Sequence, residues 1–337
     1  MKNLEEISLR ALQFLPPETA HELTLSLIKL GLAPKIDINP NLQTNLCGLQ
    51  LRSPVGLAAG FDKNALVFDE MLQCGFGFVE CGTVTPLPQS GNPKPRIFRL
   101  KSDQAVINAL GFNNMGLDNF ADSLAKRKIG CGIVGANIGA NKDSLDKIAD
   151  YVVGLKRVWQ NCSYVTINIS SPNTKGLRDL QSSMALEELL GRISVERQGL
   201  FEAHGRRPIF LKIAPDISDS EVVDISRIAI AAKIDALIIS NTTIERPFTL
   251  KSANRNRSGG LSGRPLFERS TEKLRDFNSA VDGKISLIGV GGISSGDMAV
   301  KKLEAGATAI QLYTGMIYQG MGLIAEINDA VAEFKAK

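Results

Sequence analysis

The sequence repeats one pattern from about residue 52 onward: a short apolar run, a polar or glycine-containing loop, and a stretch with helical periodicity. Runs that stay apolar throughout are typical of parallel strands covered by helices on both faces. We predict such strands at residues 55–59, 77–83, 133–138, 164–169, 209–213, 236–240, 285–290 and 308–313. We predict helices near residues 65–74, 116–128, 143–160, 183–203, 218–233, 268–280, 295–305 and 321–335. The pattern therefore constrains the chain to an α/β fold with a parallel sheet.

Eight strand–helix units in roughly 280 residues indicate a (β/α)8 TIM barrel. A doubly wound open sheet is the rival, but no G-x-G-x-x-G follows the first predicted strand. Residues 84–132 separate the second and third strands and are expected to form an insertion at the barrel mouth. No linker rich in Pro, Gly or Ser divides the chain. We therefore predict a barrel domain over residues 41–337, preceded by an N-terminal helical hairpin extension over residues 1–40.

The first forty residues do not follow the repeat and predict two helices. Apolar residues recur at helical spacing from Leu4 to Leu15, and Pro16-Pro17 ends that stretch. A second helix is expected to begin near Glu18, and its apolar arc is wider than one buried seam requires. The arc comprises Leu23, Leu25, Leu27, Ile28, Leu30 and Leu32. Either the hairpin packs on the barrel, or its surplus apolar face meets a membrane surface or a lipid-like substrate.

Composition and charge exclude several classes of protein. The 39 Lys and Arg against 35 Asp and Glu leave a formal charge of +4 without a basic stripe, which argues against nucleic acid binding. The five cysteines form no C-x-x-C pair and are typical of reduced core residues in a protein that faces the cytoplasm. Two histidines cannot build a His-rich metal site, so we expect none. We expect no signal peptide, because the first residues lack a basic n-region, an uninterrupted apolar h-region and a cleavage site, and no apolar run approaches about 20 residues.

Polar side chains follow most of the predicted strands. Catalytic groups of such barrels lie at the C-terminal ends of the strands. Any one of these residues alone is better explained as a loop residue or a helix cap. Together on one rim they indicate a site for a planar ligand with amide edges, because Asn both donates and accepts. These strand ends, with the non-polar residues of the first one included, are Ala59, Gly60, Phe61, Asp62, Lys63, Thr83, Asn137, Asn168, Ser170, Ser171, Asn173, Lys212, Ser240, Asn241, Thr242 and Thr243.

Glycines mark the loops after the last strands. Gly291-Gly292 follows the seventh strand, and Tyr313-Thr314-Gly315 follows the eighth. Together with the loop at residues 259–263, they favour a bound phosphate, because glycine lets backbone N–H groups approach an anion. Lys212 on the fifth strand points into the predicted mouth and would stabilise a reduced, anionic isoalloxazine. This favours a flavin mononucleotide over a sugar phosphate.

Five segments resemble motifs of the dihydroorotate dehydrogenases. The segment Asn-Ile-Ser-Ser-Pro-Asn-Thr-Lys-Gly-Leu-Arg at residues 168–178 resembles the signature loop of that family. The others lie at residues 56–63, 82–92, 108–114 and 259–266. The resemblance covers nearly the whole chain. It implies a barrel that holds one FMN per chain and oxidises dihydroorotate to orotate in pyrimidine synthesis.

Position 171 separates the two main branches of this family. The soluble branch carries Cys there, whereas the membrane-associated, quinone-using branch carries Ser, as this chain does. Residues 15–24 also resemble the N-terminal extension of the quinone branch. The resemblance therefore implies a quinone-dependent enzyme, peripheral on the cytoplasmic face of the cell membrane. It further implies that residues 1–34 meet the membrane and form a tunnel for the quinone, which replaces the simple packing interpretation.

Two other functions are weighed against this one. A soluble FMN-dependent relative that uses fumarate or NAD is disfavoured by Ser171 and by the extension. A flavin-binding barrel without turnover is disfavoured because Lys63, Asn168, Ser171 and Lys212 are all present. For the oligomeric state we favour a monomer.

The resemblance also implies residue roles. Ser171 is expected to remove the C5 proton of dihydroorotate while C6 delivers a hydride to the flavin. Thr174 and a water are expected to relay the proton, and Phe112 is expected to shield this relay. Residues 171–182 are expected to act as a lid. Expected substrate contacts are Lys63, Asn108, Ala109, Leu110, Gly111, Phe112, Asn168, Asn173, Asn241 and Thr242. Some family members carry Arg in place of Ala109. Expected FMN contacts are Ala59, Gly60, Phe61, Asp62, Lys63, Thr83, Asn137, Asn168, Lys212, Ser240, Gly263, Gly292, Tyr313 and Thr314.

Overall fold

The computed structural model describes residues 9, 11–127, 130 and 132–337. Its centre is a closed barrel of eight parallel strands, which confirms the predicted fold. Each barrel strand overlaps the segment predicted for it. The strands are β3 (Val55–Leu57), β4 (Phe78–Val84), β7 (Ile133–Ile138), β8 (Tyr164–Asn168), β9 (Ile209–Ile213), β10 (Ala236–Ile239), β12 (Ser286–Val290) and β13 (Ala309–Leu312). They follow one another around the barrel in that order, and β13 pairs with β3 to close it.

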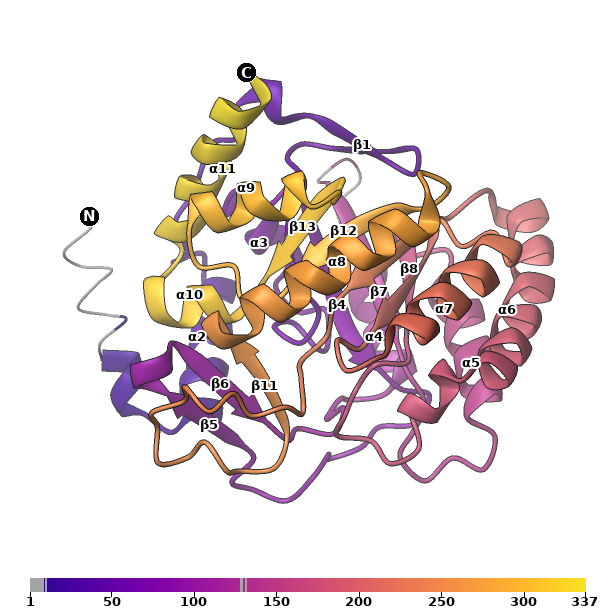
Figure 1. Cartoon of the computed structure of the whole chain (residues 1–337), viewed down its shortest axis with the longest axis horizontal. Coiled ribbons are helices and arrows are strands. Elements are labelled where there is room, and N and C mark those ends of the chain that lie inside the picture. The colour runs from indigo at the N-terminus through magenta and orange to yellow at the C-terminus, as the bar shows by residue number, and fades with distance from the viewer. Residues whose placement is uncertain (1–8, 10, 128–129, 131) are drawn as a thin grey trace.

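Helices cover the outside of the barrel (Figure 1). They are α3 (Phe68–Gln73), α4 (Leu117–Ala125), α5 (Lys147–Val158), α6 (Ser183–His204), α7 (Asp219–Ala231), α8 (Phe267–Val281), α9 (Gly296–Glu304), α10 (Thr314–Gln319) and α11 (Gly322–Lys335). Short 3-10 turns lie at Pro40–Leu42, Lys101–Asp103, Arg178–Gln181 and Arg264–Leu266. Local sequence sets some of the helix starts. Ser218 and Glu221 form a capping box at α7, and the Asp146 side chain accepts a hydrogen bond from the Ala149 N–H at 2.9 Å.

Aromatic rings fill the barrel interior at the N-terminal ends of the strands. The ring centroids of Phe78 and Tyr164 are 6.4 Å apart, and those of Tyr164 and Phe210 are 4.4 Å apart. Gly56 makes room for this layer, because a Cβ there would lie 2.3 Å from the Phe78 ring. The β1–β2 hairpin (Thr44–Leu46 and Leu49–Leu51) adds buried leucines to the same cluster. This end of the barrel is therefore closed, and only the opposite end is left for a site.

A second small sheet, which we did not predict, lies at the mouth. It joins β5 (Ile97–Leu100), β6 (Ala105–Asn108) and β11 (Gly260–Gly263) in antiparallel pairs. The first two strands belong to the expected insertion at residues 84–132, whereas β11 follows β10. Figure 1 shows this sheet at the end of the molecule opposite β1. The pairing of β6 with β11 brings two distant loops together over the carboxyl ends of the barrel strands.

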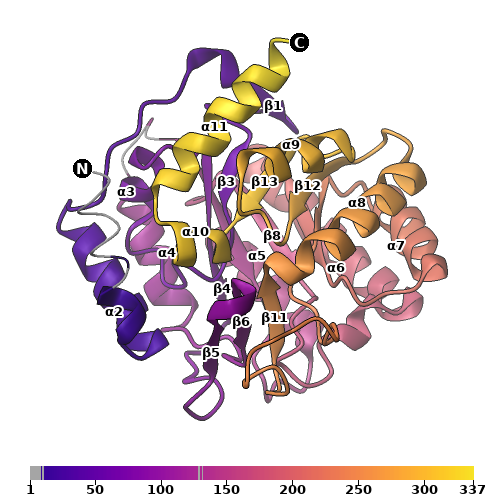
Figure 2. The ribbon, with the colours of Figure 1, turned by 60° about the vertical axis from the view of Figure 1, so that its left-hand side comes forward.

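The second predicted helix of the hairpin is α2 (Pro17–Lys29), which lies beside β5 and α3 (Figure 2). Residues 11–14 are also helical, while Leu4 and Ile7 lie outside the described residues. Glu18 of α2 forms an ion pair with Arg96, the residue before β5, and Arg96 Nη2 lies 2.9 Å from Glu18 Oε1. Arg99 donates a hydrogen bond to the Leu15 carbonyl at 2.8 Å. In the part of the chain that the structure describes, no helix is both long and apolar enough to cross a membrane.

Candidate functional site

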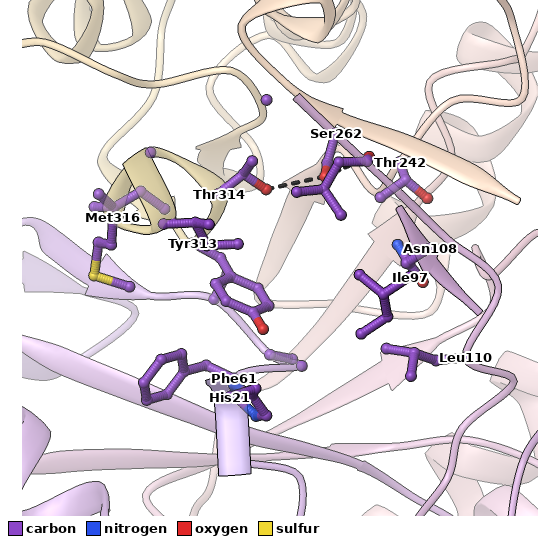
Figure 3. A pocket seen from close by; sticks show the side chains of 18 of the residues that line it. His21, Phe61, Ile97, Asn108, Leu110, Thr242, Ser262, Tyr313, Thr314 and Met316 are labelled. Carbon is purple, nitrogen blue, oxygen red and sulfur yellow. Dashed lines mark hydrogen bonds between the residues drawn. The ribbon is translucent and has the colours of Figure 1, made fainter. Parts of the chain in front are cut away.

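One cavity of about 670 Å³ lies at the carboxyl ends of the barrel strands and continues under α2 (Figure 3). Its volume is in the range of cofactor and substrate sites. Twenty of the predicted site residues line it: Ala59, Gly60, Phe61, Lys63, Thr83, Asn108, Leu110, Gly111, Phe112, Asn168, Ser171, Asn173, Lys212, Ser240, Asn241, Thr242, Gly263, Gly292, Tyr313 and Thr314. Four residues with an expected substrate, FMN or relay role do not line it, namely Asp62, Ala109, Asn137 and Thr174, and neither do the strand-end residues Ser170 and Thr243.

Two of these four stabilise the wall from behind. Asn137 at the end of β7 accepts a hydrogen bond from the Thr83 hydroxyl at 2.6 Å, and Asn168 donates to Thr83 at 2.8 Å. Asp62 accepts from the backbone N–H groups of Leu66 and Val67, each at 2.8 Å, and so fixes the turn that carries Lys63. Burial is the main cause that raises the pKa of the Asp62 carboxyl above its usual value. Both side chains therefore orient residues that do face the cavity.

Glu80 is a buried carboxylate that sequence reasoning missed. Its side chain is fully buried inside the barrel, in the middle of β4. It accepts four hydrogen bonds from side chains on β7, β8 and β13 at 2.7 to 3.3 Å, donated by Asn137, Tyr164, Thr166 and Gln311. The sequence did carry a signal for it, namely a charged residue within an otherwise apolar strand. Such a group is buried only when it has partners, so its position indicated a buried polar network.

Two buried polar groups facing the cavity lack a partner among the described residues. The Lys212 ammonium makes no hydrogen bond or ion pair there, although the residue is only 5% exposed. Burial lowers its pKa below the usual value, and the charge of Glu80 opposes this shift. The side-chain oxygen of Gln311 is likewise buried without a donor. A ligand that accepts from Lys212 and donates to Gln311 fits these two groups, which is the pattern of a flavin ring edge.

Two glycine loops that line the cavity approach each other. Gly263 and Gly292 have φ of +91° and +78°, which favours glycine. A Cβ on Gly263 would lie 2.3 Å from the Gln104 carbonyl oxygen, and one on Gly292 would lie 2.5 Å from Phe267. Figure 3 shows Thr314 beside Ser262, and their hydroxyls are 2.9 Å apart. These contacts leave bare backbone and two hydroxyls at the cavity, which suits a phosphate.

The loop after β8 places Ser171 at the cavity wall. Ser171 is 5% exposed, and its Oγ accepts a hydrogen bond from the Asn173 N–H at 3.3 Å. The Asn173 side chain donates to the Asn108 carbonyl at 3.1 Å, and Asn241 donates to the Ser170 hydroxyl at 2.9 Å. The Thr174 hydroxyl is buried and has no hydrogen-bond partner among the described residues. The polar wall therefore joins the loops after β8 and β10 to the insertion.

Arg178, which sequence analysis did not single out, connects three of the loops around the site. Its guanidinium donates to the Ser170 carbonyl at 3.1 Å and to the Thr242 carbonyl at 3.0 Å. It also donates to the Asp216 carboxylate at 2.8 Å. The planar fork of Arg suits three acceptors in different directions. Its position in the segment at residues 168–178 was a signal, but its partners lie on other loops.

Lys63 and His21 are two titratable residues that line the cavity near α2. The Lys63 ammonium donates to the Gly60 carbonyl at 2.9 Å, and burial lowers its pKa to about 8. His21 of α2 makes edge-to-face contact with Phe61 at 5.3 Å (Figure 3). Burial and then the charge of Lys63 lower the pKa of His21 to about 3, so the ring is neutral at pH 7. Other residues of the N-terminal part, including Leu12, Thr24, Leu27 and Ile28, continue this wall as a largely apolar passage.

Comparisons with known proteins point to one family. A family model described as "Dihydroorotate dehydrogenase" matches residues 41–334. The chain is 50% identical over 329 residues to a Brucella ovis protein named dihydroorotate dehydrogenase (quinone), covering 96% of this chain and 89% of that protein. A Brucella anthropi protein of the same name is 51% identical over 328 residues, with the same coverage. The crystal structure of DHODH in complex with ferulenol from Eimeria tenella superposes with a TM-score of 0.91 at 41% identity, covering 94% of this chain and 91% of that one.

The partners of Glu80 predict a large effect on stability. Glu80→Ala leaves four buried donors without an acceptor and is expected to lower the free energy of unfolding by about 3–5 kcal/mol. Urea denaturation measures this loss. Glu187→Ala is the control, because Glu187 pairs with Arg227 at 3.1 Å on the exposed surface and is expected to cost less than about 1 kcal/mol. Equal losses for the two variants would contradict a stabilising role of the buried network.

Proposed function

This chain belongs to the dihydroorotate dehydrogenase family, and we propose a role in that reaction for each wall of its cavity. It is a quinone-dependent dihydroorotate dehydrogenase, which oxidises dihydroorotate to orotate in pyrimidine synthesis and passes the electrons to a quinone. The observation that carries the assignment of roles is that one cavity unites polar strand ends, glycine loops and an apolar passage. The division into a hairpin at residues 1–40 and an FMN-binding barrel at residues 41–337 is part of the proposal.

The enzymes of this family are flavoproteins, and FMN is the flavin that we assign to this chain. The unpartnered groups of Lys212 and Gln311 support a ring edge between them. The bare backbone at Gly263 and Gly292 supports a phosphate at the other end. Bound there, the flavin would supply redox chemistry, as a hydride acceptor for the substrate and an electron donor for the quinone. The other proposed FMN contacts are Ala59, Gly60, Phe61, Asp62, Lys63, Thr83, Asn137, Asn168, Ser240, Tyr313 and Thr314.

Dihydroorotate is a small ring with amide edges and one carboxylate, and the polar wall suits both features. The Lys63 ammonium balances the carboxylate, while the amide side chains of Asn173 and Asn241 can donate to and accept from the ring. The contacts of these side chains with Asn108 and Ser170 fix their orientation before a ligand binds. The complete proposed set is Lys63, Asn108, Ala109, Leu110, Gly111, Phe112, Asn168, Asn173, Asn241 and Thr242.

Ser171 is the base in this proposal. A serine hydroxyl needs an acceptor for its own proton, and the unpartnered hydroxyl of Thr174, three residues along the same loop, supports a relay through a water. The ring of Phe112 lines the cavity and excludes water from this region. Residues 171–182 act as the lid, and Arg178 holds its base to the loops after β9 and β10.

The apolar passage under α2 is the proposed route of the quinone. Exposed apolar side chains on and beside α2 support contact of this region with a membrane surface: Leu30 is 74% exposed and Leu32 is 69% exposed. A quinone held in the membrane would then enter the passage directly. The proposed location is peripheral, on the cytoplasmic face of the cell membrane, with the chain as a monomer.

The reductive half-reaction tests the assignment of Ser171. The purified wild-type protein is expected to be yellow and to bleach when dihydroorotate is added without oxygen. Ser171→Ala is expected to keep its flavin and to bleach about 10²–10⁴-fold more slowly, because the C5 proton then has no acceptor. Stopped-flow absorbance measures both rates. Unchanged bleaching in the variant would contradict this role, and a yellow wild type that never bleaches would remove dihydroorotate as the substrate.

The pKa of Lys63 predicts how substrate affinity depends on pH. Burial lowers this pKa to about 8, so the ammonium charge is present below pH 8 and is lost as the pH rises through it. The affinity for the orotate carboxylate is therefore expected to fall about tenfold between pH 7 and pH 9. The flavin spectrum reports orotate binding. Lys63→Met should bind weakly with little dependence on pH, whereas a flat profile in the wild type would exclude Lys63 as the carboxylate partner.

A matched pair of variants on α2 tests the quinone passage. Thr24 lines the cavity, whereas Ser26 is exposed, and each hydroxyl donates to the carbonyl four residues earlier. Thr24→Trp is expected to slow flavin oxidation by quinone and to leave reduction by dihydroorotate unchanged, because the added ring blocks only the passage. Ser26→Trp should leave both half-reactions unchanged. If Thr24→Trp leaves quinone oxidation unchanged, or if fumarate or NAD oxidises the flavin faster, the quinone route under α2 is wrong.

A further inference from the structure

A buried lysine lies behind the glycine turn that follows β12. Lys302, on α9, is fully buried, and its ammonium donates to the Ser270 hydroxyl at 2.6 Å. The ammonium also lies 5.1 Å from the centroid of the Phe267 ring. Within the described residues, no carboxylate lies within ion-pair distance of it. A buried cation without a counter-ion costs free energy, so its presence requires a compensating interaction.

The partners of Lys302 lead directly to the cavity. The Ser270 hydroxyl lies 3.1 Å from the Gly291 carbonyl oxygen and 3.0 Å from that of Phe267. A Cβ on Gly291 would lie 2.8 Å from the Ser270 Oγ, and one on Gly292 would lie 2.5 Å from Phe267. The Lys302–Ser270 pair therefore holds the start of α8 against the Gly291-Gly292 turn. Both glycines line the cavity on their other side.

The charge of Lys302 lacks full stabilisation in the protein itself. Burial lowers its pKa to about 7; Glu268 opposes this shift, and Arg275 adds to it. An anion on the cavity side of the turn would supply the missing stabilisation, since charges interact strongly across a dry interior.

We propose that Lys302 is a positioning residue that makes the cofactor site select a phosphorylated flavin over riboflavin. The inference rests on the proposed FMN site. Lys302 acts there in two ways: it holds the glycine turn in place through Ser270, and it places a positive charge behind the backbone that meets the phosphate. Riboflavin has the same ring but no phosphate, so it gains nothing from the charge.

The test compares the affinity of two flavins for the full-length protein. Wild type and Lys302→Met, each dialysed free of flavin, are titrated with FMN and separately with riboflavin, and quenching of flavin fluorescence gives both dissociation constants. The variant is expected to bind FMN about tenfold more weakly and riboflavin as the wild type does. Release of flavin from the holoenzyme on dilution gives a second readout if the flavin-free variant precipitates, with faster release of FMN expected.

Two control variants separate charge from packing. Lys301→Met removes an exposed charge from the same helix, and Thr271→Val removes a buried hydroxyl that donates to the Phe267 carbonyl at 2.7 Å. Neither is expected to change the ratio of the two affinities. The proposal for Lys302 is overturned if Lys302→Met weakens both flavins equally or leaves FMN binding unchanged. A wild type that binds riboflavin as tightly as FMN would instead overturn the proposed FMN site, and this inference with it.

Discussion

The polar mouth of this barrel depends on one buried carboxylate. Glu80 accepts hydrogen bonds from three other barrel strands and thereby fixes Asn137, which orients Thr83 and Asn168 at the cavity wall. The aromatic layer of Phe78, Tyr164 and Phe210 closes the barrel on the other side of this network. A low-dielectric interior strengthens each of these hydrogen bonds, and it makes any missing partner expensive. The network therefore separates a dry, closed end from a polar, open one.

The same cost of a missing partner applies to three lysines in or behind the wall of the cavity. Lys63, Lys212 and Lys302 are buried or partly buried, and burial lowers the pKa of each. Each lacks an ion-pair partner among the described residues. In the proposed mechanism Lys63 faces the substrate carboxylate and Lys212 faces the flavin ring, while Lys302 lies behind the glycine turn that meets the phosphate. The binding of anionic ligands would then recover free energy that the folded protein spends on burying these cations.

Much of the fold was predictable because its signals are local. Strand and helix periodicity lie within ten to twenty residues, so the eight strands and most of the covering helices were predicted with small errors at their ends. The mouth sheet was not predicted. Each of its strands is four residues long, and β11 pairs with β6 across about 150 residues of sequence. Such short strands carry no periodicity of their own, and the hydrogen bonds between them form only after the barrel brings the loops together.

The sequence by itself determined the barrel and the family, because burial patterns and signature loops are read along the chain. It also named most of the residues that line the cavity, since strand ends in this fold meet at one rim. Only the tertiary structure decided which of them face the cavity and which, like Asp62 and Asn137, support it from behind. The sequence also could not predict the hydrogen-bond partners of Glu80, Arg178 and Lys302. Those contacts join residues up to 231 positions apart, and their geometry exists only once the barrel has closed.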